Sequence, residues 1–168
     1  FYSNQAQPSA KADYTIFVAE VASTCNEILL SEYLLRKYAD NRAAQIMLIG
    51  NLLEHFRTTV FRQTMFAEFE HIIHQLDQEG EALTADRLTE VYYELNKKYF
   101  GDEIVIDEQI GLEWARIPHF YYNYYVYQYA TGLSAATALS NQILTEGKPA
   151  VDRYINEFLK AGCSNYPI

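Results

Sequence analysis

The sequence predicts an all-α fold of about five helices, and three observations support this prediction. Residues 9–38 are rich in Ala, Leu, Glu and Lys and contain no Gly or Pro, which favours one long helix. Residues 43–78 place apolar side chains at three- and four-residue spacing, the pattern of an amphipathic helix. Only residues 104–106 resemble a short strand, and no second segment pairs with them. We therefore expect residues 1–168 to form a single helical domain.

The ends of the two long helices follow from polar and turn-forming residues. Residues 1–9 are polar and predict a loop-like start. Asp40 and Asn41 interrupt the helical pattern between the two segments. Gly50 lies inside the second segment, where one glycine costs only about 1 kcal/mol. Both segments are therefore expected to be continuous helices.

Local signals also predict the remaining helices. Gly80 suits the position just beyond a helix end, and Thr84 is a good N-cap for the helix that follows. Pro118 and Pro149 suit first-turn positions, where the missing N–H costs nothing. We therefore expect a connector at residues 101–111 and helices over residues 84–99, 118–144 and 149–159.

The overall composition excludes several classes of partner. A net charge of −9 argues against nucleic acid and against anionic membrane surfaces, because both need clustered Lys and Arg. No apolar run approaches the roughly 20 residues of a membrane-spanning helix, and no signal peptide opens the chain. Cys25 and Cys163 stand alone, which fits a reducing, cytoplasmic location. Phe1 and Ile168 look like the ends of a piece cut from a longer protein.

Two acidic residues stand out in the first long helix. Glu20 and Glu27 are seven residues apart, nearly two helical turns, so they share one face. Their neighbours, among them Phe17, Val21 and Cys25, are apolar, and a carboxylate in such surroundings needs a cation or a hydrogen-bond network. Solvated surface charges, or a salt bridge in the case of Glu27, are the alternatives.

A histidine followed by six tyrosines opens the segment from residue 118. His119 follows Pro118, where a purely structural histidine at a helix start is the alternative to a functional one. Within a helix, Tyr124 and Tyr127 would lie on one side, and one side of this helix must face the core. A phenol keeps its proton at neutral pH and can therefore donate to a developing oxyanion. The tyrosines of the other side are Tyr122, Tyr125 and Tyr129. With the acidic helix, this segment suggests half of a hydrolytic metal site.

Other motifs are weaker. Glu68, Glu70, His71 and His74 together resemble a metal motif. The zinc-protease pattern, however, needs His residues four apart with Glu after the first, whereas here the His residues are three apart and the Glu precedes them. Glu68 and His71 match half of a di-iron motif whose second half is missing. We expect surface or interhelical hydrogen bonds instead. Cys25 has no histidine near it in sequence, and no Gly-x-Ser-x-Gly elbow occurs.

Three segments of the chain carry a family resemblance: residues 19–27, 61–70 and 118–132. They resemble the C-terminal part of oligoendopeptidase F, a relative of thimet oligopeptidase among the zinc metallopeptidases. The resemblance implies a portion of a larger helical catalytic domain that hydrolyses internal bonds of short peptides. It implies zinc as the cofactor of the intact enzyme.

The resemblance also implies roles for individual residues. Glu20 matches the third zinc ligand, and Glu27 matches an acid that supports the zinc ligands through hydrogen bonds. His119, Tyr124 and Tyr127 match the residues that bind substrate and hold the tetrahedral oxyanion. The interval between His119 and Tyr124 is shorter than in thimet oligopeptidase, which leaves two tyrosines as substitutes for His119, namely Tyr121 and Tyr122.

One family element is missing from the sequence. No His-Glu-x-x-His occurs here, so two zinc ligands and the general base are absent. We therefore expect this chain alone to be inactive, with the missing N-terminal portion of the same protein as its partner. The alternatives are a noncatalytic helical scaffold or interaction module, and a structural fragment with no role of its own.

Overall fold

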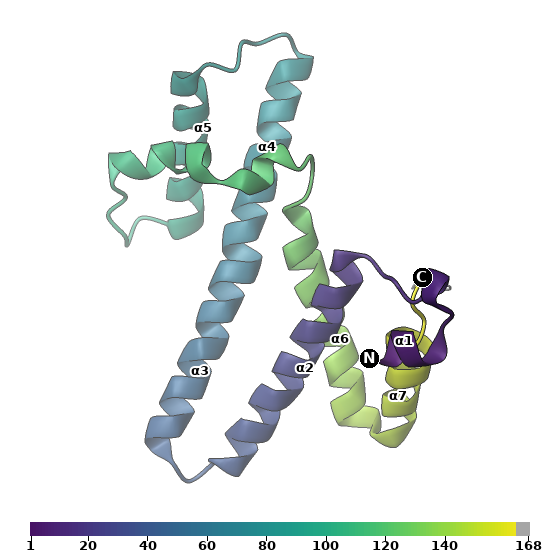
Figure 1. Cartoon of the computed structure of the whole chain (residues 1–168). Coiled ribbons are helices and arrows are strands. Elements are labelled where there is room, and N and C mark those ends of the chain that lie inside the picture. Colours follow the sequence, from purple (N-terminus) through teal and green to yellow (C-terminus); the bar gives the residue numbers. More distant parts are fainter. Residues whose placement is uncertain (164–168) are drawn as a thin grey trace. The chain divides into compact units, whose positions relative to one another are not determined.

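The computed structural model describes residues 1–163, and within this range the chain forms seven α-helices and no strand. The all-α prediction is confirmed, with more helices than the five or so expected. The α-helices are labelled in Figure 1. Short 3-10 helices (η1, η3, η4) and π-helical turns (η2, η5) accompany them. In chain order the elements are α1 (Tyr2–Ala6), η1 (Ser9–Lys11), α2 (Ile16–Lys37), α3 (Arg42–Phe56), η2 (Arg57–Phe61), α4 (Arg62–Gln78), α5 (Ala85–Phe100), η3 (Glu108–Arg116), η4 (Pro118–Tyr121), α6 (Tyr127–Glu146), α7 (Lys148–Arg153) and η5 (Tyr154–Leu159).

The chain divides into two compact units. The first contains residues 1–53 and the described residues from 131 onward, and the second contains residues 54–130. The chain thus leaves the first unit, forms the second, and returns to complete the first. The single helical domain expected over residues 1–168 stays a prediction. No helix within residues 1–163 is long and apolar enough to cross a membrane.

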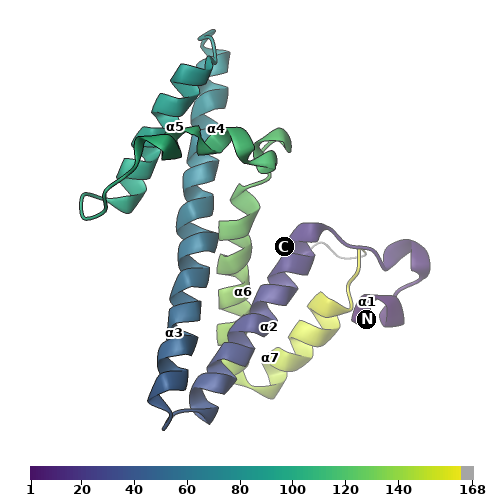
Figure 2. The ribbon, with the colours of Figure 1, turned by 60° about the vertical axis from the view of Figure 1, so that its left-hand side comes forward.

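The core of the first unit lies between α2, α6 and the C-terminal helices. Val21 and Cys25 of α2, Ala136 of α6 and Tyr154 of η5 are buried there together. Figures 1 and 2 both show α2, α6 and α7 side by side in this unit. Small residues on α6 permit this packing, since the Ala136 side chain has no exposed surface. The core therefore fixes which face of α2 points outward.

The N-terminal segment differs from the sequence prediction. Residues 2–6 form α1 where a loop was expected, and α2 begins at Ile16 rather than at residue 9. Tertiary hydrogen bonds explain α1: Ser3 Oγ donates to the main-chain oxygen of Leu159 at 2.9 Å, and Gln7 Nε2 donates to that of Lys160 at 2.9 Å. Partners more than 150 residues away in sequence are invisible to local patterns.

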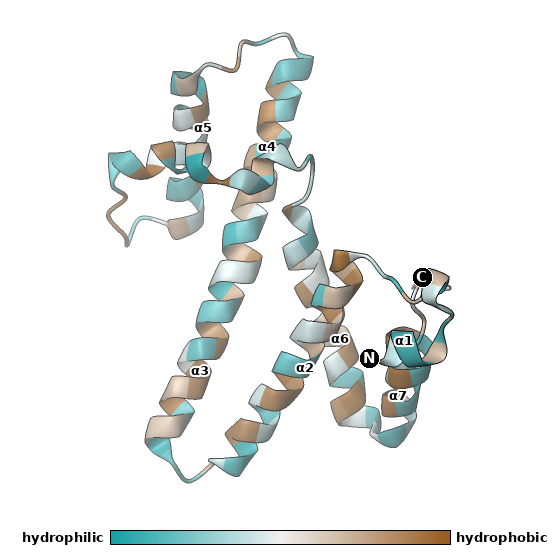
Figure 3. Ribbon diagram, in the orientation of Figure 1, coloured by the Kyte–Doolittle hydropathy of each residue, from teal (hydrophilic) through white to brown (hydrophobic). Residues whose placement is uncertain are grey.

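The second long helix is confirmed. Residues 42–78 are helical without interruption, and Gly50 lies within α3. A π-helical turn, η2, inserts between α3 and α4. Hydrophobic residues, brown in Figure 3, recur along both α2 and α3. Several of those on α3 are exposed, with Ile46, Met47 and Leu53 all at least 60% accessible.

The core of the second unit packs α4 against α5. Thr84 caps α5 as expected, since its Oγ1 accepts the main-chain N–H of Arg87 at 3.3 Å. Gly80 follows the end of α4 with a φ of +81°, also as expected. Helix η3 lies against α5, although part of it was expected to be a connector. The buried core residues are Met65, Phe66, Phe69, Val91, Tyr92, Leu95, Ile117 and Val126.

The expected helix over residues 118–144 is wrong at its start. Residues 118–121 form the 3-10 helix η4, the chain then leaves helical geometry, and α6 begins only at Tyr127. Tyr124 has a φ of +58°, which no α-helix contains. Phe120 and Val126 both pack into the core of the second unit, so burial at both ends holds the segment out of a helix. The helical-face argument for the tyrosines therefore does not apply.

Candidate functional site

The acidic pair lies on α2 in the first unit. Glu20 and Glu27 are both exposed, and neither forms an ion pair or hydrogen bond with another residue in the described range 1–163. Val21 and Cys25, on the opposite side of α2, are buried in the core and so orient the two acids outward. The structure thus confirms one continuous helix carrying both acids. It leaves their carboxylates available to a partner or an ion.

Cys25 lies between these two acids in the sequence, but its side chain has a different role. Burial raises the pKa of its thiol, and a hydrogen bond with Tyr154 only partly offsets this. A protonated thiol is a poor nucleophile. Cys25 is therefore a core residue, in agreement with the absence of a sequence signal for cysteine catalysis.

His119 lies among tyrosines in the second unit. Its ring stacks on Tyr125, with centroids 5.5 Å apart and planes 12° from parallel. Its Nε2 is 3.3 Å from the hydroxyl of Tyr129, and this hydroxyl also donates to that of Tyr125 at 3.4 Å. These two tyrosines, rather than Tyr124, form the immediate surroundings of the imidazole. We call this group the His119 cluster.

Tyr124 lies against α4. Its main-chain N–H donates to the Glu70 carboxylate at 2.7 Å, and its ring lies on that of His74 with centroids 4.6 Å apart. With 43% of its surface accessible, the residue also borders an open hollow of about 440 Å³. The other residues around this hollow are His71, His74, Gln75, Gln78 and Glu79.

The other aromatic candidates are exposed. Tyr127 opens α6 and is 53% accessible. Tyr121 and Tyr122, the alternatives to His119, are 81% and 65% accessible. The five predicted site residues therefore fall into two groups: Glu20 and Glu27 in the first unit, and the histidine and tyrosines in the second.

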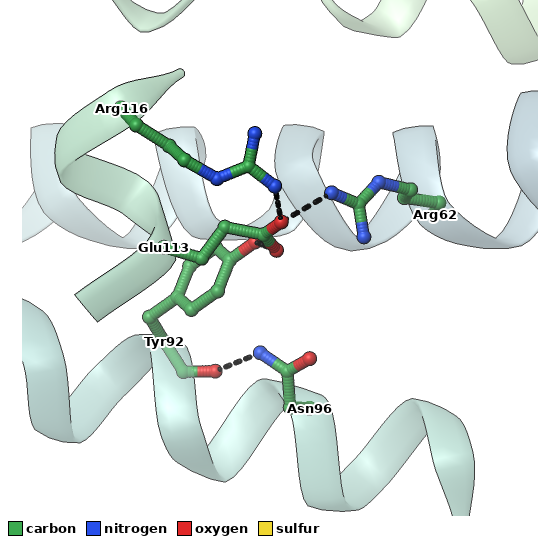
Figure 4. A network of polar contacts seen from close by, with 5 residues as sticks. All are labelled: Arg62, Tyr92, Asn96, Glu113 and Arg116. Carbon is green, nitrogen blue, oxygen red and sulfur yellow. Dashed lines mark hydrogen bonds and ion pairs between the residues drawn. The ribbon is translucent and has the colours of Figure 1, made fainter. Parts of the chain in front are cut away.

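A buried acid network supports the second unit, and sequence reasoning missed it. Glu113 of η3 is only 8% exposed; one carboxylate oxygen accepts the Tyr92 hydroxyl at 2.7 Å and the other accepts Arg62 at 2.6 Å (Figure 4). Arg116 also donates to this carboxylate. The network joins η3, α4 and α5. No spacing in the sequence connects these residues, which lie up to 54 positions apart, from 62 to 116.

The network changes the proton affinity of its members. Burial alone would raise the pKa of Glu113, but hydrogen bonds from Arg62 and Tyr92 and the nearby guanidinium charges lower it on balance. Burial raises the pKa of Tyr92, and its hydrogen bond to the Glu113 carboxylate adds to the shift. Glu113 is therefore ionised and Tyr92 protonated at neutral pH.

Glu68 takes part in interhelical hydrogen bonds, as the sequence predicted. Its carboxylate accepts Lys98 Nζ at 2.5 Å and the Tyr99 hydroxyl at 2.8 Å, both from α5. The bond from Lys98 lowers the pKa of Glu68, while burial together with this carboxylate raises the pKa of Tyr99 to about 12. Glu68 therefore serves to join α4 and α5.

The part of the chain that the structure describes does not bring together a zinc site. Within residues 1–163 no three His, Cys, Asp or Glu side chains come together as metal ligands. Glu20 offers an exposed carboxylate of the right type that has no ion-pair partner among residues 1–163, but a zinc site needs at least three protein ligands. The donor set is thus incomplete.

Comparison with solved structures defines the chain as part of a larger helical peptidase fold. It superposes on the crystal structure of oligoendopeptidase-F from Enterococcus faecium with a TM-score of 0.84 and 50% sequence identity, covering 92% of this chain and 29% of that one. The family model for peptidase family M3 matches residues 1–168. The chain belongs to peptidase family M3, in agreement with the resemblance noted in the sequence.

Curated relatives support the same assignment. The chain is 67% identical over its whole length to oligopeptidase PepF of Bacillus subtilis, and covers 25% of that protein. It is 48% identical over 167 residues to group B oligopeptidase PepB of Streptococcus agalactiae, where it covers 28%. The chain therefore spans about a quarter of the length of the curated relatives it matches.

Proposed function

We propose that this chain is part of the catalytic domain of a cytoplasmic, zinc-dependent oligoendopeptidase that hydrolyses internal bonds of short peptides. The observation that carries this proposal is the family match over residues 1–168, which includes both the acidic helix and the histidine–tyrosine segment. The exposed carboxylate of Glu20 and the exposed phenols of the second unit supply the chemistry that such an enzyme needs from this part.

Glu20 would serve as one zinc ligand in the complete enzyme. Zinc, when bound, acts as a Lewis acid toward a peptide carbonyl and lowers the pKa of water. The remaining ligands and the general base would come from outside this chain. Glu27, seven residues further along the same face of α2, would support the ligands by accepting hydrogen bonds.

The histidine–tyrosine segment would hold the substrate and its oxyanion. Phenols stay protonated at neutral pH, so Tyr124 and Tyr127 can donate hydrogen bonds to the oxygen on which negative charge develops. His119 would donate in the same way or orient the substrate, with its ring held by Tyr125 and Tyr129. Preorganised donors of this kind stabilise the transition state more than the ground state.

The test is a single hydroxyl deletion in the complete enzyme. We expect Tyr127→Phe to lower kcat by about 10²–10³-fold, because one oxyanion donor is lost, while zinc content is unchanged. Tyr33→Phe is the matched control, since Tyr33 is an exposed tyrosine of α2 that the mechanism does not use. An unchanged kcat in Tyr127→Phe would remove this tyrosine from the mechanism.

A further inference from the structure

We propose that Glu70 is a positioning residue for the tyrosine loop, residues 122–126, because its carboxylate holds the Tyr124 main chain in place. The inference rests on the proposed function in one respect, namely that the Tyr124 hydroxyl meets the reacting substrate. The anchoring itself follows from contacts within the second unit.

Glu70 is an unusual residue in its surroundings. It lies on α4 with 1% of its surface exposed, one residue after Phe69 of the core. No Lys, Arg or His within residues 1–163 forms an ion pair with its carboxylate. Burying a carboxylate without a cation is costly unless hydrogen bonds compensate. The hydrogen bond that its side chain makes is the one from the Tyr124 N–H, at 2.7 Å.

The donor of this hydrogen bond, Tyr124, is itself strained. Tyr124 has a φ of +58°, a left-handed conformation that a residue with a Cβ rarely adopts. Such a conformation persists only where the surrounding structure enforces it. The Glu70 carboxylate is well placed to enforce it, because it accepts from the strained residue directly.

His74 completes the anchor. It lies one helical turn after Glu70, and its Nδ1–H donates to the Glu70 main-chain oxygen at 2.7 Å. This bond fixes the ring, on whose face the Tyr124 ring lies at 4.6 Å with the planes 32° apart. One turn of α4 therefore holds Tyr124 twice, by its main chain and by its ring.

The position of the loop makes such an anchor necessary. Phe120 packs against Phe66 and Phe69, and Val126 is fully buried, so both ends of the segment are tied to the core. Between these two ends, Tyr124 is tied to α4 by its main-chain hydrogen bond to Glu70 and by the contact of its ring with His74. Oxyanion donors must lie about 2.7–3.1 Å from the position that the oxyanion takes, so their placement must be accurate. Glu70 supplies the missing constraint.

The experiment compares two substitutions in the complete enzyme. Glu70→Met keeps the length of the side chain but removes the acceptor, whereas Glu70→Gln keeps a carbonyl that can accept the same N–H. The readouts are hydrogen exchange of the peptide covering residues 122–126, and kcat and KM on a short peptide. For Glu70→Met we expect exchange about tenfold faster and kcat about 10–100-fold lower, with KM nearly constant. Glu70→Gln should recover most of both.

A double variant shows whether Glu70 acts through Tyr124. In a Tyr124→Phe background, Glu70→Met should lower kcat by far less than in the wild type, since coupled residues are not additive. An equal loss in both backgrounds, or unchanged exchange in Glu70→Met, would overturn the proposal. If Glu70→Met does not fold, Glu70→Asp replaces it, because its shorter side chain withdraws the acceptor while keeping the charge; unchanged exchange there would likewise overturn the proposal.

One outcome separates this inference from the proposed function. If exchange in the tyrosine loop rises in Glu70→Met while Tyr124→Phe keeps full kcat, the anchoring by Glu70 stands. The role proposed for the Tyr124 hydroxyl then fails.

Discussion

At the scale of single residues, Glu20 differs from its neighbours on α2 in its exposure to solvent. Val21 and Cys25 are buried, whereas the Glu20 carboxylate is exposed and has no partner within residues 1–163. A carboxylate held on a rigid helix, with its partner position open, loses little side-chain freedom when it binds a cation. Its place on α2 was predictable, because the helical pattern around it is strong. Its ligand role remains a proposal.

The role of Glu20 can be tested by metal content. We expect Glu20→Gln in the complete enzyme to lose most of its zinc after dialysis, because the amide is a much weaker ligand than the carboxylate. Glu32→Gln is the matched control, since Glu32 is a partly exposed acid of the same helix that pairs with Arg36. Mass spectrometry of bound metal gives the answer. Equal zinc in all three proteins would exclude Glu20 as a ligand.

At the scale of elements, the histidine–tyrosine segment shows where local sequence patterns no longer predict the structure. Pro118 predicts the start of a helix, and a 3-10 helix does begin there, but this helix ends at Tyr121. The break depends on Phe120 and Val126 entering a core built by α4 and α5, and on the Glu70 bond to Tyr124. Each of these is a contact between distant residues. In contrast, the Thr84 cap of α5 and the Gly80 turn depend on neighbours only, and both were predicted.

The buried Glu113 of η3 leads to a prediction of how the stability of the protein depends on pH. The pKa of Glu113 in the folded protein lies below its ordinary value of 4.5, so the network's contribution to stability is complete above that pH and is lost as pH falls through the lowered pKa. We expect the melting temperature of the complete enzyme to fall as the pH drops below 4.5, and to fall less in Glu113→Gln. At neutral pH the variant should melt lower than the wild type.

The control for this experiment is Glu94→Gln. Glu94 is an exposed acid of α5 paired with Lys97, and surface pairs of this kind contribute little to stability. Differential scanning fluorimetry at several pH values is sufficient. A Glu113→Gln protein with the acid sensitivity of the wild type would show that other carboxylates dominate the acid transition.

At the scale of the whole molecule, the chain corresponds to only part of the length of the family members it matches. It covers about a quarter of its curated relatives, and exposed apolar residues on α3, such as Ile46 and Leu53, have no cover within residues 1–163. In the described part of the chain the donor set for zinc is equally incomplete. The family, the fold class and the acidic helix could be predicted from the sequence. The buried network around Glu113 and the anchor at Glu70 could not, because both join residues that local spacing does not relate.

The isolated chain should therefore be inactive. We expect no hydrolysis of a fluorogenic short peptide by residues 1–168 alone, with or without added zinc, because one carboxylate cannot hold the metal. Adding the remainder of the protein as a separate polypeptide should restore activity if the two parts associate. The complete enzyme serves as the positive control. Zinc-dependent activity of the isolated chain, abolished by Glu20→Gln, would contradict this expectation.

The path of the chain between its two units has a consequence for biosynthesis. Residues 54–130 interrupt the first unit, whose α2 packs on α6 and whose α1 binds to η5. A ribosome must release the whole interruption before either contact can form, whereas the second unit is one continuous stretch and can fold as soon as it emerges. Closing so long a loop is entropically unfavourable and slows folding. Until that closure, the apolar face of α2 lacks its packing partners on α6 and η5, so the nascent chain passes through a period in which exposed hydrophobic surface makes it prone to aggregation.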